Sequence, residues 1–384
     1  MSKTLIFCAD GTWNGPDQDE DEDGLPDNTN VYKLFLALEG TLSPETLRNA
    51  EEQEKSLLVA GRTAQIAKYI HGVGDSRNPI NKIIGGAFGA GIISRIVRGY
   101  TFLSRNYEPG DEIILVGFSR GAYTARALGG LIASQGLLAK PHTRDKEHAY
   151  RWGAKAWYRY RNTSKSARRQ SFIKRLAEAV SDLPAFISAD DIQEKDLVPV
   201  ARVKAVAVWD TVGALGLPSY EQDTRIDAFR FSDNRLSDKV EWGFHALALD
   251  EQRLDFSPTF WHPRKNVIQA VFPGAHADVG GGYPTRGGES GLSNGALCWM
   301  VEQLNGIGVR FDPRWATSCP ANPGGVAHQP WRHKPFNLPG RAALRTFAGM
   351  GVQAHDTIAR RMALPAVVHE PGEAPARYKP RNLP

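Results

Sequence analysis

The sequence predicts an α/β fold in which a mostly parallel sheet carries helices on both faces, and three observations support this prediction. Short apolar runs recur along the chain. Each run ends abruptly at a glycine or a polar residue, as buried strands do. Helical patterns fill the intervals between the runs. Strands that alternate with helices form crossover units, and such units build a parallel sheet that is covered on both sides.

The expected elements can be read off in chain order. The expected strands are TLIFCA (4–9), AKYIHGV (67–73), EIILVGF (112–118), VKAVAVW (203–209) and VIQAVF (267–272). The expected helices occupy residues 29–40, 86–107, 120–136 and a stretch near 353–363. In such a sheet the chemistry lies just beyond the carboxyl ends of the strands. The residues that end each strand are therefore the first candidates for a functional site.

We expect one large domain over residues 1–384, because 384 residues of which 41% are hydrophobic can build one large core. The alternation of strands and helices stops after residue 136, and a basic and aromatic segment fills the space before the next strand. We interpret residues 137–202 as a cap inserted into this domain. After about residue 310, proline and glycine become frequent, which predicts irregular chain that wraps the sheet.

The composition excludes several classes of protein. The formal net charge of +5 is too small to indicate a nucleic-acid partner. The three cysteines lie far apart, without disulfide or metal-ligand spacing. The first apolar run is too short for the core of a signal peptide, and none approaches the length of a membrane span. We therefore expect a protein made in the cytoplasm, with export by a route that needs no cleaved signal left open.

Gly117-Phe118-Ser119-Arg120-Gly121 matches the nucleophile elbow Gly-x-Ser-x-Gly, with a strand before it and a helix after it as the motif requires. Gly117 and Gly121 are needed because side chains there would collide with the neighbouring strand and helix. The motif predicts an α/β-hydrolase fold with Ser119 as nucleophile. A structural serine in a turn is the alternative.

A nucleophilic serine needs a histidine base and an acid that orients it, and in an α/β-hydrolase both follow the serine, acid first. Asp210 directly follows a predicted strand, and His276 lies in a glycine-rich loop after the next one. We predict a Ser119, Asp210 and His276 triad. Other histidines and acids left open are His71, His245 in a stretch that looks helical, Asp250 and Asp278.

An oxyanion hole requires two backbone N–H donors, one from the residue after the nucleophile and one from the loop after an earlier strand. Arg120 supplies the first. Gly11 and Thr12, which follow the first predicted strand, are the candidates for the second. Asp10, Gly11 and Thr12 also resemble the opening of haloacid-dehalogenase phosphatases, but Cys8 replaces the nucleophilic aspartate of that chemistry.

An acidic stretch near the N-terminus raises the question of a metal site. Its spacing resembles an oxygen-ligand calcium loop, with a sharp-turn glycine at Gly24 and candidate ligands Asp19, Asp21, Asp23 and Asp27. Asn30 occupies the position where such loops place a bidentate glutamate. A solvated acidic loop is the favoured interpretation and calcium the alternative.

Taken together, the motifs resemble the DUF2235 family of α/β-hydrolases, which includes the catalytic domains of Tle1-type type VI secretion phospholipase effectors. The matching blocks span nearly the whole chain: DGTWN (10–14), TNVYKL (29–34), GFSRGAYTAR (117–126), VWDTVGALG (208–216), ALALDEQRLDFSPTFW (246–261), PGAHADVGGGY (273–283) and YKPRNLP (378–384). The resemblance implies a triad at Ser119, Asp210 and His276. It also implies a possible secretion-system or immunity partner and export by type VI secretion.

We expect a serine esterase or lipase that needs no cofactor and cleaves lipid acyl esters. Residues 140–175 hold twelve basic residues interleaved with six aromatic ones, which predicts a cap that contacts phospholipid surfaces. A solvated helix with its aromatic side chains in the core is the alternative for this segment. An esterase acting on small soluble esters, or an inactive hydrolase scaffold used for binding, is the alternative function.

Overall fold

The computed structural model describes residues 2–11, 26–46, 52–72, 87–163, 192–212 and 235–384. In this part of the chain a central sheet has nine strands in the order β11-β10-β9-β8-β5-β1-β4-β3-β2. The strands are β1 (Thr4–Ala9), β2 (Thr41–Leu42), β3 (Glu52–Val59), β4 (Arg62–Ile70), β5 (Glu112–Phe118), β8 (Val203–Trp209), β9 (Val240–Ala248), β10 (Val267–Phe272) and β11 (Val352–Ala354).

The sheet is parallel from β11 through β4, and only β3 and β2 at one edge are antiparallel. β1 and β5 are neighbours, and so are β5 and β8. The carboxyl ends of these three strands therefore meet at one place on the sheet edge. A separate antiparallel pair joins β6 (Leu137–Leu138) to β7 (Leu197–Val198).

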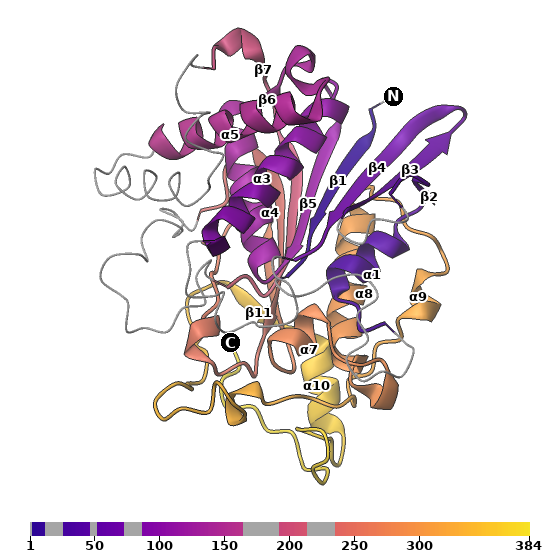
Figure 1. The fold of residues 1–384 in the computed structure, drawn as a ribbon. Helices are drawn as coiled ribbons and strands as arrows, with labels where there is room; N and C mark the ends of the chain where they lie inside the picture. The colour runs from indigo at the N-terminus through magenta and orange to yellow at the C-terminus, as the bar shows by residue number, and fades with distance from the viewer. Residues whose placement is uncertain (1, 12–25, 47–51, 73–86, 164–191, 213–234) are drawn as a thin grey trace.

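Helices cover both faces of the sheet (Figure 1). They are α1 (Asn30–Ala37), α3 (Ala87–Asn106), α4 (Arg120–Gln135), α5 (Lys146–Thr163), α7 (His276–Gly280), α8 (Gly291–Gly306), α9 (Trp315–Ser318) and α10 (Asp356–Ala363). Side chains alternate between the two faces of a strand, so Leu5 and Phe7 join the core under α3 and α4. Ile6 and Cys8 join the core under α1 and α8. This two-sided burial confirms the predicted α/β class.

Most predicted elements agree with the structure. The runs at 4–9, 112–118, 203–209 and 267–272 are strands with those bounds, and a helix occupies Asp356–Ala363. The helical interpretation around His245 is wrong, because Val240–Ala248 is the strand β9. β9 lies between two parallel strands, and its residues Val240, Trp242 and Phe244 alternate with Glu241, Gly243 and His245, which is the period of a strand.

The predicted cap, residues 137–202, is described only in part, because residues 164–191 lie outside the described ranges. Its main described element, α5, packs on α3 and α4. Gly153 of α5 faces Val97 and Thr101 of α3, and Tyr160 approaches Gly130 in the second half of α4. In this part of the chain the insertion therefore forms an outer helical layer, away from the Ser119 end of α4.

Candidate active site

Ser119 lies in the tight turn between β5 and α4. Its φ and ψ angles are 56° and −119°, a region that side-chain-bearing residues rarely adopt. Its backbone N–H donates to the carbonyl of Trp209 on the adjacent strand (3.1 Å), and the residue is 6% exposed. Backbone strain of this kind concentrates at functional sites, where the surrounding structure holds it in place.

The two glycines of the elbow permit close backbone packing. A Cβ atom on Gly117 would lie 2.3 Å from the carbonyl oxygen of Gly121. A Cβ atom on Gly121 would lie 2.0 Å from the carbonyl oxygen of Ala9, the last residue of β1. No side chain fits at either distance, so the glycines let α4 begin directly against the ends of β1 and β5.

The structure brings Asp210 and His276 into direct contact. Asp210 follows β8 and His276 is the first residue of α7, just beyond β10. The Nδ1 atom of His276 lies 2.6 Å from Oδ2 of Asp210, and both residues are buried. The imidazole also packs on the ring of Phe118, with a centroid distance of 4.6 Å. It therefore lies against the residue that immediately precedes Ser119.

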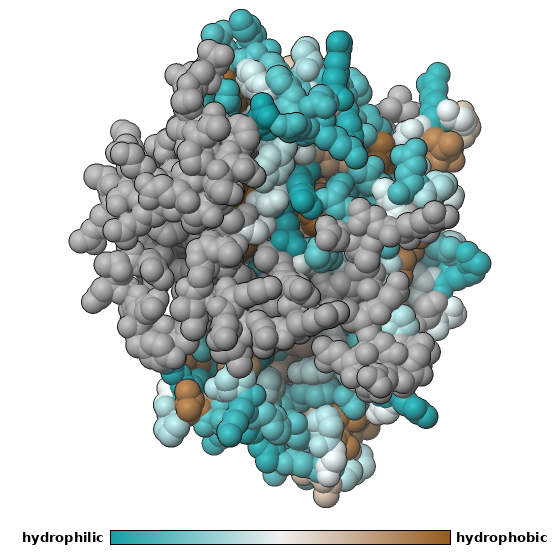
Figure 2. Space-filling model, in the orientation of Figure 1, coloured by the Kyte–Doolittle hydropathy of each residue, from teal (hydrophilic) through white to brown (hydrophobic). Residues whose placement is uncertain are grey.

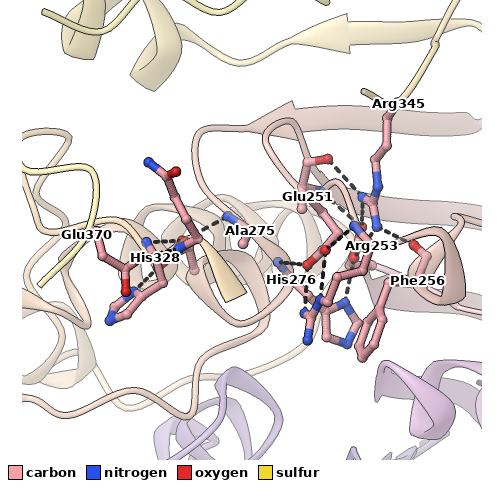
Figure 3. A network of polar contacts seen from close by, with 12 residues as sticks. Glu251, Arg253, Phe256, Ala275, His276, His328, Arg345 and Glu370 are labelled. Carbon is pink, nitrogen blue, oxygen red and sulfur yellow. Dashed lines mark hydrogen bonds and ion pairs between the residues drawn. The ribbon is translucent and has the colours of Figure 1, made fainter. Parts of the chain in front are cut away.

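Arg345, which the motifs did not identify, binds Asp210 through both terminal nitrogens. Nη1 lies 2.6 Å from Oδ1 and Nη2 lies 3.0 Å from Oδ2. The guanidinium also donates to the carbonyls of Ala248 (2.8 Å) and Phe256 (2.6 Å), so it ties the acid to two neighbouring segments. Figure 3 shows Arg345 and Phe256 gathered beside His276. No sequence signal marks Arg345, because it lies in irregular chain between α9 and β11.

Glu251 is a second residue that sequence reasoning missed as part of the site. Its Oε2 accepts the backbone N–H of His276 (3.1 Å), and its carboxylate binds Arg253. Arg253 in turn lies over the ring of Phe256, with a centroid distance of 3.6 Å. Figure 3 shows these side chains around the histidine. The block ALALDEQRLDFSPTFW contains all three, and its spacing alone does not show that they converge.

The charges favour an ionised acid next to a neutral base. Burial opposes ionisation of Asp210, but the Arg345 guanidinium and the hydrogen bond to His276 hold the pKa of its carboxyl well below the usual range. Burial lowers the pKa of His276, and the hydrogen bond to Asp210 only partly offsets this effect. The ionised carboxylate accepts from Nδ1–H, which leaves Nε2 of the neutral ring as a proton acceptor.

The alternative acids serve elsewhere. Asp250 accepts from the backbone N–H of Gly274 (2.7 Å) and from the hydroxyl of Tyr378 (2.8 Å). Asp278 contacts His328, with 2.7 Å between Oδ1 and Nδ1. Each of these carboxylates therefore has its own set of partners, apart from His276.

The alternative histidines also lie in other settings. His245 is buried in β9, and its Nε2 accepts the backbone N–H of Thr211 (3.1 Å). Burial lowers the pKa of His245 to about 3, so it is a neutral core residue. His71 follows β4, and its carbonyl accepts from Nε of Arg95 (2.6 Å).

The structure describes two of the three residues that were predicted to supply oxyanion donors. Arg120 is the first residue of α4, where backbone N–H groups have no acceptor within the helix. Gly11 lies beside the elbow, because β1 pairs with β5, but its N–H donates to Oδ1 of Asp10 (2.7 Å). Gly11 can therefore serve only after this N–H turns away from Asp10. Thr12 lies outside the described residues.

Asp10, the residue behind the phosphatase alternative, is buried among neutral donors. It accepts from the hydroxyls of Thr29 (2.8 Å) and Tyr69 (2.7 Å), and burial raises the pKa of its carboxyl to about 6. Of the candidate calcium ligands, Asp19, Asp21 and Asp23 lie outside the described residues, while Asp27 is buried. Within the described ranges no group of three or more histidine, cysteine or acidic side chains is arranged to hold a metal ion.

The aromatic part of the predicted lipid-contact surface is wrong for the described residues. Trp157 is 3% exposed in the core shared by α3, α4 and α5, and Tyr150, Trp152 and Tyr160 pack against that core. The arginines and lysines of α5 lie toward solvent, and the top of the molecule is mainly hydrophilic in Figure 2. The helix is amphipathic, and burying its rings against α3 removes more apolar surface from water than exposing them would.

Comparisons with known proteins give a family match and three similar proteins. Residues 3–303 match the family described as "T6SS, Phospholipase effector Tle1-like, catalytic domain". A stretch of 151 residues is 31% identical to "Uncharacterized protein YEL023C" of Saccharomyces cerevisiae and covers 36% of this chain and 18% of that protein.

The solved structures that are similar to this chain include the following two. An uncharacterized protein from Pseudomonas aeruginosa has a TM-score of 0.42 and 19% identity, over 84% of this chain and 49% of that one. The Tle1 effector bound to the VgrG spike from the type 6 secretion system has a TM-score of 0.38 and 17% identity, over 74% of this chain and 52% of that one. The match therefore covers about half the length of each of these two structures. It covers less than a fifth of the length of the yeast protein, at 18%.

Proposed function

Since the chain belongs to the family of Tle1-like phospholipase effector catalytic domains, we propose that it hydrolyses acyl esters of glycerophospholipids with Ser119 as nucleophile. The observation that carries the assignment of residues is the buried Asp210 and His276 pair, which lies against the strained elbow of Ser119. The elbow holds a serine that could act as nucleophile, and the pair could act as a base with its orienting acid.

The proposed reaction has two halves. Ser119 Oγ attacks the ester carbonyl while Nε2 of His276 takes the hydroxyl proton, and the imidazolium then protonates the departing lysolipid alkoxide. Water attacks the acyl-serine, again giving a proton to His276, and the fatty acid leaves as Ser119 recovers its proton. Asp210 holds the ring through Nδ1 and stabilises the imidazolium. The backbone N–H of Arg120 would bind the oxyanion, and that of Gly11 would join it after turning away from Asp10. The chemistry needs no metal.

The family also suggests a protein partner and a place where the substrate is met. The solved Tle1 effector is bound to a VgrG spike, and we propose a secretion-system partner and export for this chain as well. In the described residues no helix is long and apolar enough to cross a membrane. We propose that the lipid is met at a bilayer surface, where exposed cations of the 140–163 segment contribute roughly 1 kcal/mol each on anionic lipid.

The substrate class can be tested with vesicles. We expect fatty acid release from phosphatidylglycerol vesicles by the wild-type chain and none by the Ser119→Ala variant. Glutamate at Arg144, Lys146 and Arg151, which are exposed, is expected to slow hydrolysis on vesicles but not of p-nitrophenyl butyrate, because only the former needs a charged surface. Turnover of the soluble ester with none on vesicles would contradict the lipid assignment and favour an esterase for small substrates.

The pH dependence of kcat/KM gives a separate prediction. His276 must be neutral to accept a proton, and burial lowers its pKa from the ordinary value of about 6.5. We expect the acid limb of the profile to have its midpoint below pH 6.5 with p-nitrophenyl butyrate as substrate. A midpoint above pH 7 would mean that the histidine is stabilised in its charged form, contrary to its surroundings here.

A further inference from the structure

A cavity of about 240 Å³ lies between the C-terminal residues 377–382 and the segments that contain Asp250, His328 and Leu344. Its walls include Trp331 and the alternating cations Arg377, Lys379 and Arg381. The volume is below the roughly 300–1,000 Å³ of pockets for drug-sized ligands, so it suits a small polar group rather than an acyl chain. Figure 1 shows the C-terminus at the same end of the sheet as α7.

The three cations Arg377, Lys379 and Arg381 line the cavity and are exposed. Tyr378, between the first two, is buried and donates a hydrogen bond from its hydroxyl to Asp250 (2.8 Å), which fixes this part of the chain against the body of the protein. Among the described residues none of the three lies within ion-pair distance of a carboxylate, whereas most arginines near the site are paired.

The cavity has little negative charge to balance these cations. Asp250 is the acid in its lining, and it already accepts from Tyr378 and from the backbone of Gly274. Burial raises the pKa of Asp250 to about 6, so its ionised form is less favoured than that of an exposed aspartate. The rest of the wall is made by polar and aromatic residues that include Gln252, Gln329, Asn382 and Trp331.

The walls of the cavity are joined to the catalytic network. Asn382 donates to the carbonyls of Leu249 (2.9 Å) and Arg345 (3.2 Å), and Arg345 holds Asp210. His328, also in the lining, binds Asp278 two positions after His276. A ligand in the cavity would therefore touch the chain that positions both members of the pair.

We propose that this cavity binds a phosphate group, with Arg377, Lys379 and Arg381 as its cationic wall. Phosphate matches such a wall because each of its oxygens accepts charge-assisted hydrogen bonds from arginine or lysine. The phosphate belongs either to the head group of the lipid substrate or to a small free phosphate. The head-group source rests on the proposed function, while the phosphate chemistry does not.

Titration calorimetry on the full chain with sn-glycerol 3-phosphate tests the proposal. The triple variant Arg377→Ala, Lys379→Ala, Arg381→Ala is expected to bind at least about tenfold more weakly than wild type, since each charge-assisted contact contributes to affinity. The matched control replaces the exposed Arg62, Lys239 and Lys265 by alanine, which removes the same charge elsewhere. Its affinity is expected to stay within about twofold of wild type, because distant surface charges are screened.

Parallel titrations separate the two sources. Tighter binding of sn-glycerol 3-phosphate than of inorganic phosphate, with a higher KM of the pocket variant on phosphatidylglycerol vesicles, supports the head group. Equal affinities with an unchanged KM support a free phosphate. Equal binding by the pocket and control variants, or no binding by wild type, overturns the site, and since no turnover is required this outcome is independent of Ser119. A single Arg381→Ala variant repeats the measurement if the triple variant unfolds.

Discussion

Replacing Ser119 by alanine is expected to lower kcat for ester hydrolysis by about 10⁴- to 10⁶-fold, because the nucleophile and base of a triad act as one unit. Alanine keeps the Cβ atom, so the strained backbone at φ 56° experiences the same contacts. The serine side chain does not cap α4, and its loss is expected to leave the unfolding temperature nearly unchanged. Steady-state kinetics with p-nitrophenyl butyrate and thermal denaturation measure the two effects.

Matched variants show whether the partners are those in the structure. His276→Ala and Asp210→Asn are expected to be severely impaired, and wild type but not Ser119→Ala is expected to react with a fluorophosphonate probe. His245→Ala and Asp250→Asn act as controls, because both side chains have other partners. Full activity of Ser119→Ala would remove the mechanism. A loss confined to the His245 or Asp250 variant would keep the elbow but replace the base or the acid.

Arg345→Met is expected to lower the free energy of unfolding by about 3–5 kcal/mol at pH 7, the range for removing one partner of a buried ion pair. The side chain of Arg345 is 5% exposed and that of Asp210 is fully buried. Without the guanidinium the carboxylate keeps, among the described residues, only the hydrogen bonds from His276 and the backbone N–H of Ala248. Urea denaturation of wild type and variant at pH 7 measures the loss.

The pH dependence of this loss has a definite sign. The folded pKa of Asp210 is lowered, so its stabilisation is present above the unfolded aspartate pKa of about 3.9 and is lost as pH falls through the folded value. The difference between wild type and Arg345→Met is therefore expected to shrink when denaturation is repeated near pH 3. A difference that does not change with pH would indicate lost packing rather than a lost charge.

The same variant reports on positioning of the base. Loss of the guanidinium charge leaves the Asp210 carboxylate free to raise the pKa of His276, so the acid limb of kcat/KM is expected to move to higher pH. Arg345→Lys keeps the charge without the two-pronged contact and is expected to restore the limb but only part of the stability. An acid limb that is identical in all three proteins would mean that Arg345 acts on stability alone.

Much of the fold was predictable because the relevant signals are local. The strands at 4–9, 112–118, 203–209 and 267–272 carry apolar runs with clear stops, and each stop follows from side-chain chemistry within a few residues. The signal for the elbow is also local, because the close contacts that require glycine at Gly117 and Gly121 are made at the turn itself. β9 was misjudged because the helical interpretation started at Phe244, whereas the alternation that indicates a strand starts at Val240.

The sequence shows the order of the acid and the base along the chain, but only the fold shows that the two side chains are in contact. The sequence by itself determined that Asp210 and His276 follow strands, after Ser119 and in that order. Sheet order then decided that their side chains meet, while Asp250 and Asp278 turn to Tyr378 and His328. Arg345 could not be foreseen, because a contact across 135 residues from irregular chain leaves no period or spacing to read.

The tertiary structure likewise decided which way the aromatic rings of α5 face. A basic and aromatic sequence is compatible with a lipid-facing or a core-facing helix, and α3 and α4 supply the apolar surface that buries Trp157. A strand end or a tight turn depends on neighbouring residues, so the sequence by itself determines it. The partner of a buried charge or ring depends on which distant segment removes it from water without leaving polar groups unpaired, so only the tertiary structure determines it.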